Sequence, residues 1–262
     1  MPDPTPALTA GLAVLGLIVG SFVNVVAYRV PRGLSVIRPP SACPSCDHRI
    51  RAWDNVPVVS WVLLGGHCRD CGTRIPVRYP IVEALTGAIF VATGFLLGVT
   101  WALPAYLWFG TTGVALVLTD IDHRRLPDRI VFAGLIGGGA LLVLAVVGGD
   151  DLGWGDLGRG VGGAAIYFAF MFLLAELTRG GFGFGDVKAA LLLGLFLAFR
   201  SWDALAVGVV VAFLLGGLVA VVLMLLRVRG RRDAIAFGPA LIAGAMLAVV
   251  WGSDLADWYL RR

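Results

Sequence analysis

Residues 102–122 read ALPAYLWFGTTGVALVLTDID, an apolar stretch about as long as one membrane crossing that ends on two aspartates, Asp120 and Asp122. A second acidic segment, Gly183-Phe184-Gly185-Asp186, stands at the start of another apolar stretch. Carboxylates at or near the depth of a bilayer are expensive to bury, and they mark candidate functional sites. Two of them that meet on one side of a membrane predict acid–base chemistry.

The composition agrees with a membrane protein. Of the 262 residues, 58% are hydrophobic and only 15% are charged, which excludes an ordinary soluble domain. Apolar segments near the length that a bilayer requires cover residues 7–27, 81–99, 102–119, 130–148, 160–178, 186–199, 204–226 and 237–253. We therefore predict an all-α polytopic membrane protein with about eight transmembrane helices and a small polar insert.

Basic residues predict the orientation, because they concentrate in cytoplasmic loops. If residues 29–80 are cytoplasmic, 17 of the 21 lysines and arginines lie on that side, and only Arg159, Arg200, Arg261 and Arg262 lie outside. This arrangement predicts that both termini are outside. The first helix is predicted to be retained and not cleaved as a signal peptide, since no basic region precedes it. The positive charge orients helices in the lipid bilayer and gives no reason to expect a nucleic-acid partner.

The polar segment 29–80 contains all four cysteines, as Cys43-Pro44-Ser45-Cys46 and Cys68-Arg69-Asp70-Cys71. Two such C-x2-C pairs can place four thiolates on one tetrahedral metal ion, which predicts a closed, structural zinc site. Disulfides are the alternative, but the cytoplasm is reducing. The chain thus divides into a first transmembrane helix (1–28), a cytoplasmic zinc-binding insert (29–80) and a seven-helix membrane domain (81–262).

The two acidic segments are predicted to meet. Two complete spans lie between Asp120 and Asp186, so the chain returns to the same face of the membrane. Two carboxyls a few ångströms apart do not both ionise easily, so one holds a proton while the other is charged, as the activation of water against a carbonyl requires. Coupled groups titrate as a pair, and neither residue is assigned as the permanent acid. The alternative for Asp186 is a helix cap.

Three charged residues near Asp120 and Asp186 in the sequence are predicted to have accessory or structural roles. Asp122 follows Asp120 by two residues and points to a different face of a helix, so it is an accessory candidate. Two roles stay open for Lys188: it tunes the pKa of Asp186, or it anchors the helix end at the membrane surface. Asp128, just before the next apolar segment, is predicted to be the N-cap of that helix.

Glycines precede the second acidic segment. Gly183 and Gly185 belong to a glycine-rich stretch, residues 178–185, that permits close approaches of the backbone. The span that follows, 186–199, is short for a bilayer. We therefore expect this stretch to dip to membrane depth, where irregular backbone is tolerated if it lines protein or a wet cavity.

Six segments in order carry a family resemblance: 20–31 (GSFVNVVAYRVP), 53–61, 78–83, 120–128 (DIDHRRLPD), 183–188 (GFGDVK) and 237–239 (FGP). Together they resemble the bacterial type IV prepilin peptidases, membrane aspartic peptidases of the GxGD type. The resemblance implies that Asp120 and Asp186 are catalytic, and that prepilin or pseudopilin leaders are cut on the cytoplasmic side of the bacterial inner membrane. It also implies N-methylation of the product with S-adenosylmethionine as methyl donor, for which the sequence offers no Rossmann pattern.

Two other classes of function stay open. A proton-coupled transporter also keeps carboxylates in the membrane, but it predicts acids near the midplane and paired structural halves. A zinc-knuckle adaptor, in which the insert binds a partner and the helices only anchor it, predicts that the acids are dispensable.

Overall fold

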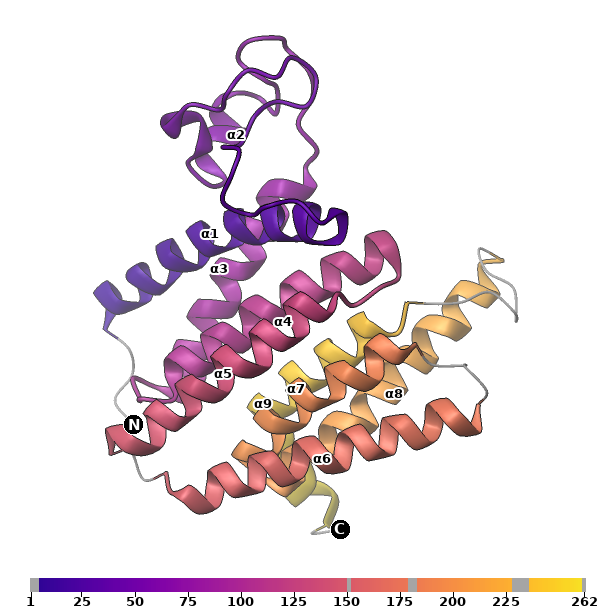
Figure 1. The fold of residues 1–262 in the computed structure, drawn as a ribbon. Helices are drawn as coiled ribbons and strands as arrows, with labels where there is room; N and C mark the ends of the chain where they lie inside the picture. The colour runs from indigo at the N-terminus through magenta and orange to yellow at the C-terminus, as the bar shows by residue number, and fades with distance from the viewer. Residues whose placement is uncertain (1–4, 150–151, 179–182, 228–235, 261–262) are drawn as a thin grey trace. The chain divides into compact units, whose positions relative to one another are not determined.

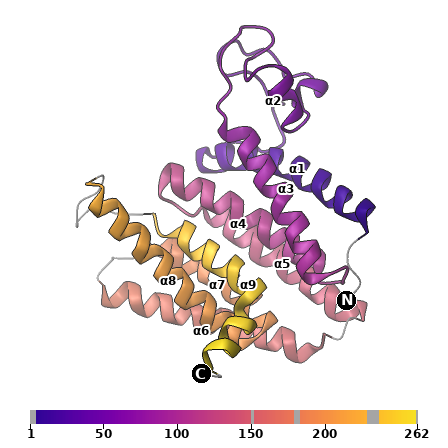
Figure 2. The same cartoon turned by 180° about the vertical axis from the view of Figure 1, so that it is seen from behind.

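The computed structural model of the protein describes residues 5–149, 152–178, 183–227 and 236–260. These residues form helices and loops, with only two isolated β-bridges among them, so the predicted all-α class is confirmed. They fall into two compact units, Met1–Val99 and Thr100–Arg262. Figure 1 and Figure 2 show the helices of both units from opposite sides.

The first unit is built on two long helices, α1 (Pro6–Arg29) and α3 (Arg78–Leu97). Gly16 and Gly20 lie four residues apart on one face of α1, and a Cβ on either would lie 2.7 Å from a Cα atom of α3. Small residues let helix backbones approach closely in a membrane, where packing replaces the hydrophobic effect as the force between helices. These two glycines therefore set the close spacing of α1 and α3.

The insert leaves α1 through the 3-10 helix η1 (Val30–Arg32), and contains η2 (Ala52–Asn55) and the short helix α2 (Val59–Leu63). It is tied to α3 by Glu83, whose Oε2 accepts the backbone N–H of Val58 at 2.7 Å. Glu83 is buried, and Val58 has a φ of 63°, which is unusual for a β-branched residue. The buried carboxylate therefore holds a strained point of the insert against a membrane helix.

The second unit contains six long helices: α4 (Leu103–His123), α5 (Asp128–Gly148), α6 (Trp154–Leu177), α7 (Phe184–Arg200), α8 (Trp202–Leu225) and α9 (Gly238–Leu260). Its centre is α7, which contacts α5, α6, α8 and α9 and has 12 of its 17 residues buried. A Cβ on Gly194 would lie 2.5 Å from the carbonyl oxygen of Gly163, so α6 and α7 pack backbone to backbone. Arg159 of α6 donates to the carbonyls of Ala198 and Phe199, which fixes the C-terminal end of α7.

Each of the eight predicted apolar segments corresponds to a long helix. Six of these helices are long and apolar enough to cross a membrane: α1, α3, α5, α6, α8 and α9. Within the described part of the chain, α4 and α7 are not long or apolar enough to meet this requirement. They are enclosed by protein instead: 13 of the 21 residues of α4 are buried, against 4 of 24 in α8. The count of eight spans is therefore approximate, and the two internal helices carry the acidic segments.

Candidate active site and metal centre

Asp120 lies in the last turn of α4 and is only 5% exposed. Its Oδ2 accepts the backbone N–H of Gly238, the first residue of α9, at 2.9 Å. The first N–H groups of a helix have no partner within the helix, and the positive end of the helix dipole favours a negative group there. The contact therefore gives a donor to a buried carboxylate and an acceptor to a helix terminus.

Asp186 is the third residue of α7 and is 9% exposed. Its carboxyl lies close enough to Asp120 for the two groups to interact electrostatically, although 66 residues separate them in the sequence. The N-cap of α7 is Gly183, so Asp186 does not occupy the cap position. The structure thus brings the two predicted acids together, at the C-terminal end of α4 and the N-terminal end of α7.

A buried loop residue, Leu126, lies beside the first turns of α7 and α9. A Cβ on Gly185 would lie 3.2 Å from the Cβ of Leu126, and a Cβ on Gly238 would lie 3.2 Å from its Cδ2. Leu126 is 7% exposed and follows Asp120 by six residues. It therefore packs against the segments that present both acids, and Gly185 is the predicted accessory glycine that permits this approach.

Lys188 pairs with Asp128. Its Nζ lies 2.7 Å from Oδ2 of Asp128, and 5.3 Å from the centre of the Phe184 ring. The prediction that Asp128 caps α5 was wrong, because Pro127 occupies the N-cap and Asp128 is the first helical residue. A carboxylate in the first turn still suits the helix dipole, and there it also binds a cation on the neighbouring helix.

We expect Lys188→Gln and Asp128→Asn each to lower the melting temperature of the detergent-solubilised protein slightly, because an exposed ion pair contributes about 0–1 kcal/mol. The double variant should melt no lower than the more sensitive single variant, since both changes remove the same contact. Thermal unfolding followed by circular dichroism measures this. Fully additive losses would contradict the pairing.

The remaining accessory candidates are less enclosed. Asp122 is exposed, in contrast to Asp120 two residues earlier on the same helix. Gly183 precedes α7, and a Cβ there would lie 3.4 Å from Oδ2 of Asp186. The predicted dip of the glycine-rich stretch to membrane depth concerns chiefly residues 179–182, which lie outside the described residues.

The four cysteines of the insert form one cluster. Their Sγ atoms all lie within 4.8 Å of one another, and those of Cys43 and Cys71 are 3.7 Å apart. Tetrahedral zinc with Zn–S bonds of about 2.3 Å places its sulfurs about 3.8 Å apart, whereas a disulfide requires about 2.05 Å. The sulfur positions therefore fit a four-thiolate zinc site.

The two C-x2-C pairs are built by the same local structure. Asp47 N–H donates to the carbonyl of Cys43, and Gly72 N–H donates to the carbonyl of Cys68, each at 2.9 Å. Asp47 and Gly72 both have positive φ, 53° and 69°, a conformation that aspartate and glycine tolerate. Each turn directs its two thiols to the same point. The residue after the second cysteine of each pair, Asp47 or Gly72, has the positive φ that the turn requires.

Hydrogen bonds and ion pairs support this cluster. Thr73 lies 3.3 Å from Sγ of Cys71, and the hydrogen bonds of its hydroxyl and backbone lower the pKa of that thiol to about 6. This favours the thiolate of Cys71, which is the form that binds metal. At Cys46 the hydrogen bond of the His48 backbone is outweighed by burial and by the thiols of Cys71 and Cys43, which raise the pKa of the Cys46 thiol. Arg69 holds Asp54 through two nitrogens, and its hydrogen bonds lower the pKa of the Asp54 carboxyl. The ion pair joins the second cysteine turn to the segment between the pairs.

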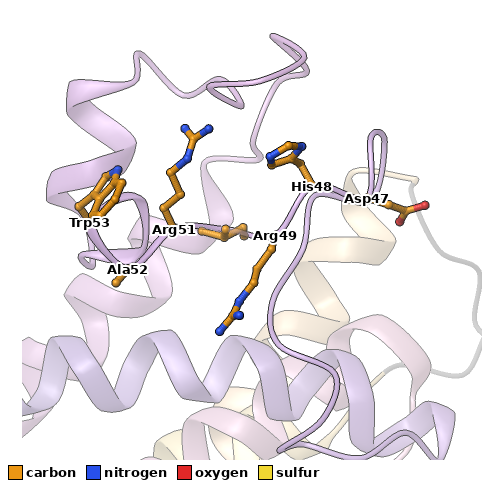
Figure 3. A pocket seen from close by; sticks show the side chains of 7 residues that line it. Asp47, His48, Arg49, Arg51, Ala52 and Trp53 are labelled. Atoms are coloured by element: carbon orange, nitrogen blue, oxygen red, sulfur yellow. The ribbon is translucent and has the colours of Figure 1, made fainter.

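A hollow of about 540 Å³ in the insert is lined by residues 47–53, and Figure 3 shows their side chains. The side chains of His48, Arg49 and Trp53 border it, and Arg51 beside them is bound to Asp70 at 2.9 Å. The lining of the hollow mixes two arginines, one histidine and one aspartate with three apolar side chains. It belongs to the first unit, whereas the paired acids belong to the second.

Sequence reasoning did not identify three residues near the acids. Gly238 and Leu126 lie within segments 237–239 and 120–128 of the family resemblance, but neither residue was given a role of its own. His123, three residues after Asp120, has a buried Nε2 with no hydrogen-bond partner among the described residues. No local pattern in the sequence marks these contacts, because each depends on which helix ends meet.

Comparison with known proteins links both units to one group of enzymes. Residues 14–97 match the Bacterial Peptidase A24 N-terminal domain, and residues 107–225 match the Type IV leader peptidase family. Similar proteins, each named prepilin leader peptidase/N-methyltransferase, occur in Aeromonas hydrophila (33% identity, 94% of this chain, 91% of the relative), Pseudomonas putida (36%, 95%, 93%) and Bacillus subtilis strain 168 (31%, 95%, 97%). No solved structure matches the chain.

Proposed function

Because this chain belongs to the type IV leader peptidase family, we propose that it is a membrane aspartic peptidase that removes leader peptides from type IV prepilins or pseudopilins. The observation that carries the proposal is that two buried carboxyls, Asp120 near the C-terminal end of α4 and Asp186 in the first turn of α7, are close enough to interact electrostatically. These are the two acids that the chemistry of peptide hydrolysis requires.

In the proposed mechanism, the Asp120/Asp186 pair shares one proton. The ionised carboxylate takes a proton from water, and the water oxygen bonds to the carbonyl carbon of the scissile peptide. The protonated partner gives its proton to the carbonyl oxygen. Collapse of this intermediate breaks the C–N bond as a proton passes to the leaving amine, so the products are a free acid and a new N-terminus. No covalent bond to the enzyme forms.

The tetracysteine insert has a structural part in this proposal. Cys43, Cys46, Cys68 and Cys71 would hold Zn²⁺ and stabilise the fold of residues 29–80, which bury little apolar surface of their own. Four thiolate ligands leave zinc no open position, so the ion would take no part in hydrolysis.

Methylation of the new N-terminus is the second proposed activity, because the similar proteins carry N-methyltransferase in their names. S-adenosylmethionine is the proposed methyl donor. A Rossmann-type donor site has no counterpart in the described part of the chain, which contains no parallel strands.

We place the protein in the bacterial inner membrane with many crossings, in agreement with its six candidate spans and its relatives. The excess of basic residues in alternate loops supports a cytoplasmic insert and active site, with both termini outside. The prepilin would then present its leader from the cytoplasm. The transporter and adaptor alternatives are not favoured, since the similar proteins are named as peptidases.

The direct test is cleavage of a purified prepilin by the purified protein in detergent. We expect a shorter product on a gel, and a product one methyl group heavier when S-adenosylmethionine is present. Mass spectrometry of the new N-terminus measures both changes. Failure of the unmodified, folded protein to shorten any of several prepilins and pseudopilins would overturn the proposal.

A further inference from the structure

We propose that Gly238 is a positioning residue for Asp120: its backbone N–H fixes one oxygen of the catalytic carboxylate, and its missing side chain makes room for that carboxylate. This inference rests on the proposed function. Its first support is the hydrogen bond from Gly238 N–H to Oδ2 of Asp120, 2.9 Å long and buried. With Oδ2 held in this way, Oδ1 is the oxygen of Asp120 that this bond leaves available for proton transfer.

The second support is steric. A Cβ on Gly238 would lie 2.6 Å from Oδ2 and 3.1 Å from Cγ of Asp120, and 3.2 Å from Cδ2 of Leu126. The backbone of Gly238 does not itself require glycine, because its φ is not in the left-handed region. The close approach of Asp120 is therefore the reason that explains a glycine at this position.

The third support is the way that the helix ends meet. Leu126 packs beside Gly238 on one side and beside Gly185 on the other, and Gly185 directly precedes Asp186. Movement of Gly238 or of the Asp120 carboxylate would therefore be transmitted to the segment that carries the second acid. Catalytic groups need placement to within about 0.5 Å, which contacts of this kind provide.

The first experiment compares alanine variants of three glycines in the prepilin cleavage assay. Gly238→Ala should lower kcat by about 100-fold, the usual cost of displacing a catalytic group by about 1 Å, with KM within about twofold. Its melting temperature should stay near that of the unmodified protein. Gly217→Ala is the matched control, because a Cβ there meets nothing within 4 Å.

Gly244→Ala separates positioning from packing. Its Cβ would lie 2.6 Å from the backbone nitrogen of Ala212, so this variant should melt lower yet keep a normal kcat while it is folded. A Gly238→Ala protein with unchanged kcat, or one whose defect consists only of a lower melting temperature, would overturn the inference. If neither the unmodified protein nor Gly217→Ala cleaves the prepilin, the proposed function is overturned, and this inference with it.

A second measurement does not depend on activity or on the folding of Gly238→Ala. The chain contains four Phe–Gly bonds, at Gly110, Gly183, Gly185 and Gly238, so labelling with carbonyl-13C phenylalanine and 15N glycine selects four amide signals. In Asp120→Ala, the Gly238 signal should move upfield and its hydrogen exchange should become faster, because it loses its acceptor. Gly110, early in α4, serves as the internal reference. An unchanged Gly238 signal would refute the contact.

Discussion

Replacement of either Asp120 or Asp186 by asparagine is expected to abolish leader cleavage, with a loss in kcat of about 10⁴-fold, because an amide neither takes up nor releases the proton of hydrolysis. Asparagine keeps the size of aspartate, and in Asp120→Asn its side-chain oxygen still accepts the N–H of Gly238. The fold should therefore survive. Gel analysis of prepilin cleavage, with melting temperature measured in parallel, tests the two expectations together.

The double variant should be no slower than the single variants, since residues that act as one unit lose their contribution together. Asp203→Asn is the matched control, because Asp203 is exposed in the first turn of α8. Normal cleavage by a well-folded Asp186→Asn protein would remove Asp186 from the mechanism. Equal losses in the Asp203→Asn protein would show that the assay reports stability instead of chemistry.

Replacement of Cys43 and Cys71 together by serine is expected to remove the metal and unfold the insert. The two sulfurs are 3.7 Å apart and come from different C-x2-C pairs, so the variant keeps only one ligand in each turn. Structural zinc contributes about 10–16 kcal/mol to the folding of small domains, far more than 52 residues with little apolar core supply otherwise. Zinc content by mass spectrometry should fall from one ion per chain to near zero.

Limited proteolysis should then cut within residues 29–80, and methylation should suffer more than cleavage, because the paired acids belong to the other compact unit. His48→Ala and His67→Ala are the controls, since neither histidine belongs to the four-residue cluster. Both should keep one zinc ion per chain. Stoichiometric zinc in the double serine variant would contradict the ligand assignment.

The positions of the helices along the sequence were predictable, because their causes are local. A bilayer demands long apolar segments, so each of the eight segments appears as a helix whose ends lie within a few residues of the prediction, apart from α6 and α9. The tetracysteine cluster was predictable for a similar reason, since two short turns each fix the spacing of two thiols. The sequence also shows each acid at the end of an apolar segment, and the predicted topology places Asp120 and Asp186 on the same side of the membrane.

The contacts between helix ends were not predictable in the same way. Lys188 could be assigned to Asp186 or to a membrane anchor, and only the packing of α5 beside α7 shows that it binds Asp128. The N–H of Gly238 meets Asp120 across 118 residues of sequence. Hydropathy and spacing describe one segment at a time, so they carry no information on which termini come together.

The bond between Glu83 and Val58 limits how the chain can be re-engineered. A shortened protein made by joining α1 directly to α3 would lose the N–H of Val58 but would keep a carboxylate inside the α1–α3 helix pair. The hydrogen bond to Ser21 of α1 would remain, but a buried acid that loses one of its donors is costlier to keep, so such a deletion would be more stable with a neutral residue at position 83. The insert is therefore not a detachable module, because one residue of its supporting helix is adapted to its presence.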